Sequence, residues 1–355
     1  MKRIAVFAKY GMLAASSRQR LAQYAPYLAE AGFELEYFTL LDDSYLNAIF
    51  SERKPSSFAI ANGYLKRVAQ ILTLKGFSAI WLHTELFPYL PGPFEQLIKL
   101  CGIPIIYDFD DAIFHQYDAH PSLLVRKILG GKLKTTLKGA RLTLAGNEYL
   151  AEYARRFCRE VEVIPTVVDT SLYQVDRSHQ PKHLTIGWIG SPSTWQLCKI
   201  YLPTLRQICE QMGACFKVIG AGPQADEIEF VTNRRWREAD EIGEIQSMTV
   251  GVMPLDDSPF ALGKCGYKLI QYMACGIPVV ASPVGVNAKI VDHGVNGFLA
   301  STDEDWHKYL TILLKDKNLA RRMGAAGRRK IEAEYSLKVF GPRVAKLFQM
   351  VTAYG

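Results

Sequence analysis

The chain has 355 residues, of which 49% are hydrophobic and 22% are charged, and it carries a net charge of +7. This composition excludes disordered and fibrous proteins, and a basic excess this small is not that of a nucleic-acid-binding protein. A length of 355 residues exceeds what one hydrophobic core usually serves, so we expect two domains.

Seven cysteines occur without any C-x-x-C pair, which argues against a disulfide framework and a zinc site and favours a reducing cytoplasm. The apolar run at residues 4–7 is too short for a leader peptide, and no apolar run approaches the roughly 20 residues that span a bilayer. We therefore expect a cytoplasmic protein. It could also associate peripherally with the cytoplasmic face of the inner membrane.

Short apolar runs alternate with helical stretches through the first half of the chain. The pattern predicts strands at residues 3–8, 33–40, 79–83 and 103–109, separated by helices at 17–31, 64–75 and 94–101. Such alternation is typical of a doubly wound parallel α/β sheet.

The alternation begins again in the second half. It predicts strands at residues 184–190, 216–220, 248–255 and 277–282, helices at 201–212 and 267–275, and a helical region from Trp306 onward. Residues 169–183 between the two series are polar and lack either period, so we place a domain boundary near residue 178. Two Rossmann-like domains would face a cleft at the carboxyl ends of their strands, where ligands bind in such sheets.

Two segments of the second half could bind phosphate. Gly190 and Ser191 lie between a strand and a helix, where glycine allows close approach and helix amides attract anions. Gly263 and Gly266 flank Lys264 before the next predicted helix, which carries Lys268 four residues later; two ammonium groups beside a helix start suit a diphosphate. The alternatives are an ordinary turn with a serine cap and a helix with two solvated lysines.

The second half resembles the donor-binding domain of glycosyltransferase family 4, retaining enzymes of the GT-B fold. The resemblance is densest in YMACGIPVVAS, VGVNAKIVDHG and NGFLA, within residues 272–300. It implies an acceptor-binding domain at residues 1–178, a nucleotide-sugar-binding domain at 179–335, and a C-terminal helix at 336–355 that packs back on the first domain.

Family members carry two glutamates, eight residues apart, beside the donor. The matching positions here are Gly263 and Gln271, so neither glutamate is present. Gln271 can still hydrogen-bond ribose hydroxyls. The resemblance also implies donor contacts for Tyr267 and for Trp236, which lies where relatives begin their base pocket; a buried core tryptophan is the alternative for Trp236.

Three carboxylates, Asp108, Asp110 and Asp111, follow a predicted core strand. By themselves they could bind magnesium or manganese. The resemblance instead implies metal-independent catalysis, with Asp110 where relatives carry a histidine beside the acceptor and Asp111 matching the acid that follows it. His83 and Glu85, at the end of the preceding strand, are further catalytic candidates, against purely structural roles.

The remaining candidates lie in the first half. Arg18 resembles a position that reaches toward donor phosphate or acceptor, and Asn147 follows a short strand that faces the cleft. The tract at residues 123–141 has six basic residues and no acidic one. We expect its leucines to pack on their own domain and its basic face, including Lys132, to lie toward an anionic membrane or lipid-linked acceptor.

Together these features predict a retaining transferase that moves a sugar from a nucleotide diphosphate donor to a hydroxyl of a saccharide or lipid-linked acceptor in cell-surface polysaccharide or glycoconjugate synthesis. No cofactor, metal or nucleic acid is expected. The alternatives are an inactive nucleotide-sugar-binding subunit, which the missing glutamates motivate, and a sugar epimerase or phosphorylase on the same fold.

Overall fold

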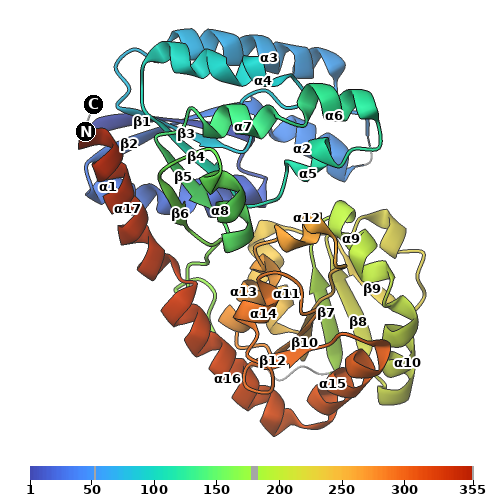
Figure 1. Ribbon diagram of the computed structural model, residues 1–355. Helices are drawn as coiled ribbons and strands as arrows, with labels where there is room; N and C mark the ends of the chain where they lie inside the picture. The colour runs from blue at the N-terminus through green and yellow to red at the C-terminus, as the bar shows by residue number, and fades with distance from the viewer. Residues whose placement is uncertain (52, 177–182, 354–355) are drawn as a thin grey trace. The chain divides into compact units, whose positions relative to one another are not determined.

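The computed structural model describes residues 1–51, 53–176 and 183–353. The chain forms two compact units (Figure 1). The first contains residues 1–166, residues 263–265 and the chain from residue 340 onward, and the second contains residues 167–262 and 266–339. The predicted boundary near residue 178 lies outside the described residues.

A six-stranded sheet in the order β2-β1-β3-β4-β5-β6 forms the centre of the first unit. All its neighbouring strands pair in parallel, and every residue of β3 and β4 is buried, because helices cover both faces of such a sheet. Its strands are β1 (Lys2–Tyr10), β2 (Phe33–Leu41), β3 (Ala79–His83), β4 (Ile105–Phe109), β5 (Leu142–Ala145) and β6 (Val161–Val163).

Three helices of the first unit begin at residues whose side chains cap them. Asp42, Ser56 and Asn147 accept hydrogen bonds from the first amides of α2, α3 and α8. The predicted helix at residues 17–31 is instead three short pieces. The elements are η1 (Ser17–Leu21), η2 (Ala22–Tyr24), α1 (Ala25–Glu30), α2 (Asp43–Phe50), α3 (Ser57–Leu72), α4 (Gly92–Glu95), η3 (Gln96–Cys101), α5 (His115–Asp118), α6 (Leu123–Leu129), α7 (Lys132–Leu137) and α8 (Glu148–Arg155).

The last helix, α17 (Leu337–Ala353), closes the first unit from residue 340 onward. The Phe348 ring lies edge-on to Trp81 of β3 at 4.9 Å between centroids, and Lys2 Nζ donates a hydrogen bond to Thr352 O. The end of the chain is thereby tied to the central strands of the first sheet.

The second unit has a six-stranded parallel sheet in the order β12-β11-β10-β7-β8-β9. Apolar clusters cover both faces, and Trp188, Trp195 and Trp306 are almost completely buried within one of them. The predicted fold class, two doubly wound parallel sheets, is confirmed. The strands are β7 (Thr185–Ile189), β8 (Cys215–Ile219), β9 (Val231–Arg234), β10 (Val250–Met253), β11 (Val279–Ala281) and β12 (Gly297–Leu299).

Two strands of this sheet, β9 and β12, were not predicted. Both are short edge strands, and β9 consists of half-buried and exposed residues, so neither has a strong apolar pattern. The helices are α9 (Pro192–Lys199), α10 (Leu202–Met212), η4 (Pro223–Ala225), η5 (Glu238–Asp240), α11 (Glu241–Gln246), α12 (Pro259–Leu262), α13 (Tyr267–Ala274), α14 (Asn287–Ile290), α15 (Asp303–Lys315) and α16 (Lys317–Glu334). In the described part of the chain, no helix combines the length and apolar character needed to cross a membrane.

Candidate functional site

Candidate residues of the first unit gather where β3, β4 and β5 end. His83 is the last residue of β3, Asp110 follows β4, and Asn147 follows β5. His83 Nε2 lies 3.5 Å from Asp110 Oδ1, and Thr166 Oγ1 donates a hydrogen bond to Asp110 Oδ2 at 3.4 Å. Parallel strands bring their carboxyl ends to one edge, which explains why residues far apart in sequence meet here.

Asp110 is held in its ionised form. Burial acts to raise its pKa, but the neighbouring His83 and the cations of Arg20 and Lys264 act more strongly in the other direction, and the pKa falls to about 2. At neutral pH this side chain can accept a hydrogen bond from a substrate hydroxyl, and it has no proton to donate.

Asp108 has a different environment, although it stands only two residues away. Its Oδ1 accepts from Arg20 Nε at 3.0 Å and Nη2 at 2.8 Å, and its Oδ2 accepts from Trp81 Nε1 at 3.3 Å. Burial raises the pKa of Asp108, and Arg20 opposes that shift. The three predicted carboxylates therefore do not share one site: Asp108 belongs to a buried ion pair.

Glu85 is likewise engaged inside the protein. Its Oε1 lies 2.7 Å from Lys132 Nζ and accepts a hydrogen bond from Tyr117 at 2.6 Å. Lys132 Nζ also lies 3.3 Å from Glu95 Oε1, and Glu95 accepts the amides of Leu86 and Phe87 at 3.0 Å. This network fixes the loop after β3.

Lys132 corrects the expectation of a basic face across residues 123–141. It is 1% exposed and paired with two buried carboxylates, so it cannot contribute to such a face. Leu133 and Leu137 are buried as expected, whereas Leu123 and Leu124 are 74% and 65% exposed.

The backbone is strained where β3 ends. Thr84 has a φ of +63°, which is unfavourable for a β-branched residue. Its amide donates to Asp108 O at 2.8 Å, and its carbonyl accepts from Tyr107 Oη at 2.7 Å. These bonds hold the unusual conformation immediately beside His83, a placement typical of functional sites.

Residues 263–265 belong to the first unit, where Asn147 holds them. Its Nδ2 donates to Gly263 O at 3.0 Å and to Lys264 O at 3.1 Å, while its Oδ1 caps α8. Lys264 Nζ lies 2.9 Å from Asp111 Oδ1, and Cys265 Sγ donates to Asp110 O at 2.9 Å. Asn147 thus fastens this tripeptide beside Asp110.

The positions of Lys264, Gly263 and Arg18 bear on the roles expected from the sequence. Lys264 precedes α13, which begins at Tyr267, so Lys264 and Lys268 do not share a helical face. A Cβ at Gly263 would stand 2.4 Å from Ala112 Cβ and 2.7 Å from its nitrogen. Gly263 therefore has no room for the glutamate that the resemblance implies at this position. Arg18 Nη1 donates to Met12 O and Leu13 O at 2.8 and 2.9 Å, which folds its side chain back on its own loop.

In the second unit, the loop after β7 is tightly packed. Gly190 N donates to Ile219 O, and Ser191 N donates to Thr194 Oγ1, so both amides already have protein partners. Both amides are therefore engaged in this conformation, and a phosphate role for Gly190 and Ser191 stays a prediction beside the alternative of a capped turn at α9. A Cβ at Gly190 would stand 2.5 Å from the Trp188 ring, so a glycine is required there.

The helix α13 follows Gly266, its N-cap, which has a φ of +66° that favours glycine. Lys268 lies in its first turn, with Nζ 5.4 Å from the centre of the Trp188 ring. Lys268 and the first amides of this helix both belong to the second unit, and they are the candidates there for binding phosphate.

A hydrogen-bonded cluster surrounds Glu241 at the start of α11. Its Oε2 accepts from Trp236 Nε1 at 2.6 Å, and its Oε1 accepts from Gln271 Nε2 at 2.8 Å and from Tyr173 Oη. Gln271 Nε2 also donates to Tyr173 Oη at 3.1 Å, and Tyr267 Oη lies 3.5 Å from that oxygen. Burial, and then the Glu241 charge, raise the pKa of Tyr173.

The sequence alone does not identify Glu241, although its carboxylate joins two predicted donor residues, Trp236 and Gln271, and Tyr267 lies next to them through Tyr173. The signal was weak, because Glu241 is one of several acidic residues in the stretch from Glu238 to Glu244. Only the fold shows that its carboxylate meets Gln271, the position at which the resemblance implies a glutamate.

The part of the chain that the structure describes contains no candidate metal site. There, no three His, Cys, Asp or Glu side chains are placed to share an ion. Metal-independent catalysis stays a prediction.

Comparison with known proteins finds a family similarity in the second half of the chain. Residues 183–316 match the family model for group 1 glycosyl transferases. An N-acetyl-alpha-D-glucosaminyl L-malate synthase from Bacillus anthracis is 24% identical over 300 residues, covering 71% of this chain and 77% of that protein. A GDP-mannose-dependent monoacylated alpha-(1-6)-phosphatidylinositol monomannoside mannosyltransferase from Corynebacterium glutamicum is 34% identical over 85 residues, only 24% of this chain and 22% of that protein.

Solved structures match almost the entire chain. Anabaena HepE in complex with UDP and glucose superimposes with a TM-score of 0.75 at 15% identity, over 99% of this chain and 100% of that one. Sucrose-phosphate synthase from Thermosynechococcus elongatus gives 0.74 at 16% identity over 100% of both chains. The chain thus has the GT-B fold, and its residues 183–316 are similar to the group 1 glycosyl transferases.

Proposed function

We propose that this protein is a retaining, metal-independent glycosyltransferase that transfers a sugar from a nucleotide diphosphate to a hydroxyl of a saccharide or lipid-linked acceptor in cell-surface glycoconjugate synthesis. The family match and the name of one curated relative, a mannosyltransferase, support transfer, and the name of the other, an N-acetyl-alpha-D-glucosaminyl L-malate synthase, is consistent with it. The observation that carries the proposal is the cluster of Trp236, Glu241 and Gln271 in the same unit as the first turn of α13.

The donor binds the second unit in this proposal. The Trp236 ring contacts the base, and Glu241 with Gln271 binds the ribose hydroxyls. A carboxylate can accept about four hydrogen bonds. Three come from Trp236, Gln271 and Tyr173. These bonds fix the orientation of the Glu241 carboxylate and leave it able to accept one more hydrogen bond, from a ribose hydroxyl. Lys268 and the first amides of α13 neutralise the diphosphate.

The acceptor binds the first unit. Asp110, ionised because its pKa is near 2, accepts the hydrogen bond of the attacking hydroxyl, and His83 orients Asp110 from 3.5 Å. The hydroxyl attacks from the face of the leaving group through an oxocarbenium-like state, and the departing phosphate takes its proton. Positive charge near that phosphate stabilises the developing negative charge. Lys264 contributes there only after releasing Asp111, so we expect it to matter less than Lys268.

Ligand-induced stabilisation tests the donor site directly. UDP, GDP and ADP sugars are compared by thermal shift, because a ligand at 100 times its dissociation constant stabilises the native state by about 2.7 kcal/mol. We expect one nucleotide series to raise the Tm and Trp236→Ala to abolish that shift. The absence of stabilisation by any of the three would overturn the proposed donor site.

An inactive nucleotide-sugar-binding subunit is the second candidate, because Gly263 has no space for the family's glutamate. It predicts the same thermal shift with no loss of sugar from the donor. Incubation of a labelled donor with saccharide and lipid-linked acceptors, followed by product separation, distinguishes the two functions: a glycosylated product supports the transferase.

A further inference from the structure

Helix α3 exposes a stripe of large apolar side chains. Phe58, Leu65 and Leu72 are 83%, 71% and 81% exposed, and their spacing of seven residues places them on one face of the helix. The opposite face packs closely on the sheet: a Cβ at Gly63 would stand 2.4 Å from Leu40 O. This amphipathic helix therefore turns its largest apolar residues outward.

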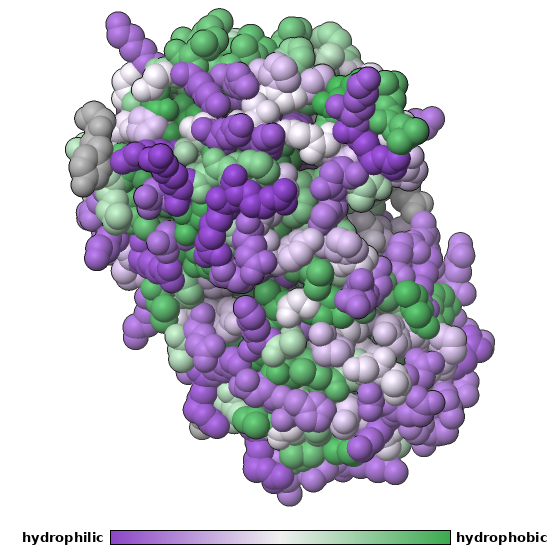
Figure 2. All heavy atoms as spheres, in the orientation of Figure 1, coloured by the Kyte–Doolittle hydropathy of each residue, from purple (hydrophilic) through white to green (hydrophobic). Residues whose placement is uncertain are grey.

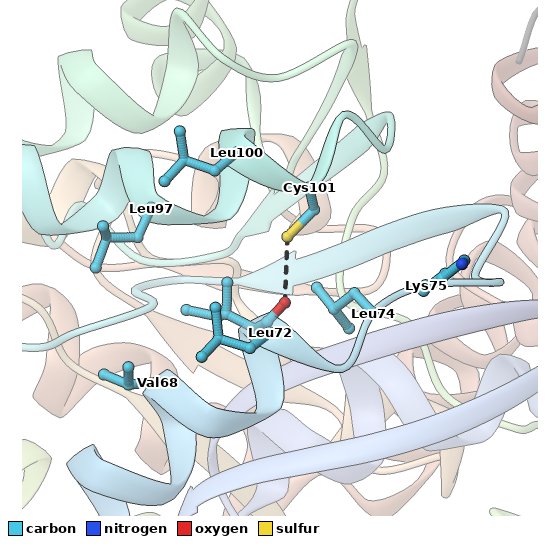
Figure 3. Close-up of a pocket in the computed structure, with 8 residues that line it drawn as sticks. Val68, Leu72, Leu74, Lys75, Leu97, Leu100 and Cys101 are labelled. Atoms are coloured by element: carbon cyan, nitrogen blue, oxygen red, sulfur yellow. Dashed lines mark hydrogen bonds between the residues drawn. The ribbon is translucent and has the colours of Figure 1, made fainter.

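The stripe continues onto η3. Leu100 is 83% exposed, and six aliphatic side chains of α3, η3 and their flanking residues line a groove of about 340 Å³ together with Lys75 and Cys101 (Figure 3). Cys101 Sγ donates to Ile71 O at 3.3 Å across it. Hydrophobic surface also gathers along the upper edge of Figure 2, where Figure 1 places α3. We call the exposed surface of residues 57–75 and 96–101 the α3 face.

The charges around the α3 face have one sign. From residue 53 to residue 78 the chain has five basic residues and no acidic one, and residues 96–101 add Lys99. Lys66, Lys75 and Lys99 are exposed, whereas Arg67 is buried. An apolar stripe flanked by lysines has the composition of helices that lie in the interface of an anionic bilayer.

We propose that the α3 face docks on an anionic lipid bilayer, with Phe58, Leu65, Leu72 and Leu100 entering the interfacial layer and Lys66, Lys75 and Lys99 contacting headgroup phosphates. The charges favour this occupant over a second copy of the chain. Two such faces in contact would bring lysines against lysines with no carboxylate of either face to compensate, whereas a bilayer supplies the opposite charge. The proposal does not depend on the catalytic assignments.

Co-sedimentation with vesicles tests the docking surface. We expect the full chain to bind equimolar phosphatidylcholine and phosphatidylglycerol vesicles, to bind phosphatidylcholine alone weakly, and to be released by salt. The double variant Leu65→Ser, Leu72→Ser and the triple variant Lys66→Glu, Lys75→Glu, Lys99→Glu should each lower the partition coefficient at least about 10-fold.

Matched controls replace exposed residues elsewhere. Leu172→Ser changes a leucine that is 63% exposed in the second unit, and Lys315→Glu, Lys317→Glu, Lys338→Glu makes the same charge change there. Both should retain more binding than the α3-face variants, and thermal melting should show all variants folded. Neutralising Lys134 and Lys138 tests the alternative tract at residues 123–141.

Three outcomes would overturn the proposal. The first is no binding to the anionic vesicles, and the second is unchanged binding by both α3-face variants while the Lys134 and Lys138 variant loses it. The third is a dimer in analytical ultracentrifugation that the leucine variants dissociate without any effect on vesicle binding, which would make a second copy the occupant.

Discussion

The two units position their candidate residues by different means. The first unit uses ion pairs, and three that the structure describes are buried: Arg20 with Asp108, Lys132 with Glu85, and Lys132 with Glu95. The second unit surrounds one carboxylate, Glu241, with neutral donors. Charges that are paired with each other hold strands and loops in place but are not available to bind a ligand. Neutral hydrogen-bond donors instead orient a carboxylate without neutralising it. Substitutions should therefore separate folding effects in the first unit from ligand effects in the second, with Asp110 as the exception.

Asp110→Asn should have the largest effect on turnover. Loss of the charge that polarises the attacking hydroxyl should lower kcat by about 10²- to 10⁴-fold with little change in donor affinity. Steady-state transfer assays measure kcat, and thermal shift measures donor binding. Asp111→Asn is the matched control, because Asp111 is more exposed and paired with Lys264. Equal losses in both variants would contradict the special role of Asp110.

Arg20→Met should reduce stability more than any other change to the first unit discussed here. It leaves Asp108 buried without its cation, which costs about 3–5 kcal/mol. Urea unfolding followed by circular dichroism measures this loss. Arg3→Met is the control, since its pair with Glu36 is about half exposed and contributes about 0–1 kcal/mol. A similar midpoint for both variants would show that the buried pair is not a main support of the fold.

Gln271→Glu should weaken donor binding, even though it introduces the glutamate that the resemblance implies at this position. The new carboxylate would stand where an amide now donates to Glu241 at 2.8 Å, and two like charges repel. We expect about a 10-fold rise in donor Kd by calorimetry. The double variant Glu241→Gln, Gln271→Glu returns one charge to the pair and should recover most of the affinity. Additive losses in the double variant would show that the two residues act independently.

The low pKa of Asp110 predicts how acid affects the protein. Its folded value of about 2 is below the ordinary 3.8, so the folded state favours the ionised form. The stability gained this way is present above pH 4 and is lost as the pH falls toward 2. The difference in Tm between the native protein and Asp110→Asn should be constant from pH 5 to 7 and shrink below pH 4. A difference that shrinks between pH 7 and 5 would exclude a depressed pKa.

Lys264→Met should have the smallest effect on folding. Its partner Asp111 is 40% exposed, so the pair contributes about 0–1 kcal/mol. Lys268→Met, which removes a charge from the first turn of α13, should weaken donor binding more than Lys264→Met does. Calorimetric titration with the stabilising nucleotide compares them, and the reverse order would move the phosphate contact from Lys268 to Lys264.

The sequence predicts the repeated strands and helices well, because buried parallel strands are nearly continuous apolar runs. It predicts less about which side chains meet. Lys132 and Glu85 are 47 residues apart, and no local sequence pattern marks either of them as buried. Their burial as a pair depends on the packing of α7 against the loop after β3. Glu241 is hidden among other acidic residues for the same reason. A tripeptide such as residues 263–265 is too short to have any pattern, and only tertiary contacts assign it to the first unit.

That tripeptide makes the protein difficult to divide. The chain passes between the units after residues 166, 262, 265 and 339, so neither unit is a continuous stretch of polypeptide. A fragment ending at residue 166 would lack both the α17 residues that cover Trp81 and the residues that Asn147 binds. Exchange of the second unit between homologous proteins at a single splice point would carry a foreign tripeptide into the first unit. A working chimera of this protein would need to keep Gly263, Lys264 and Cys265 with the first unit.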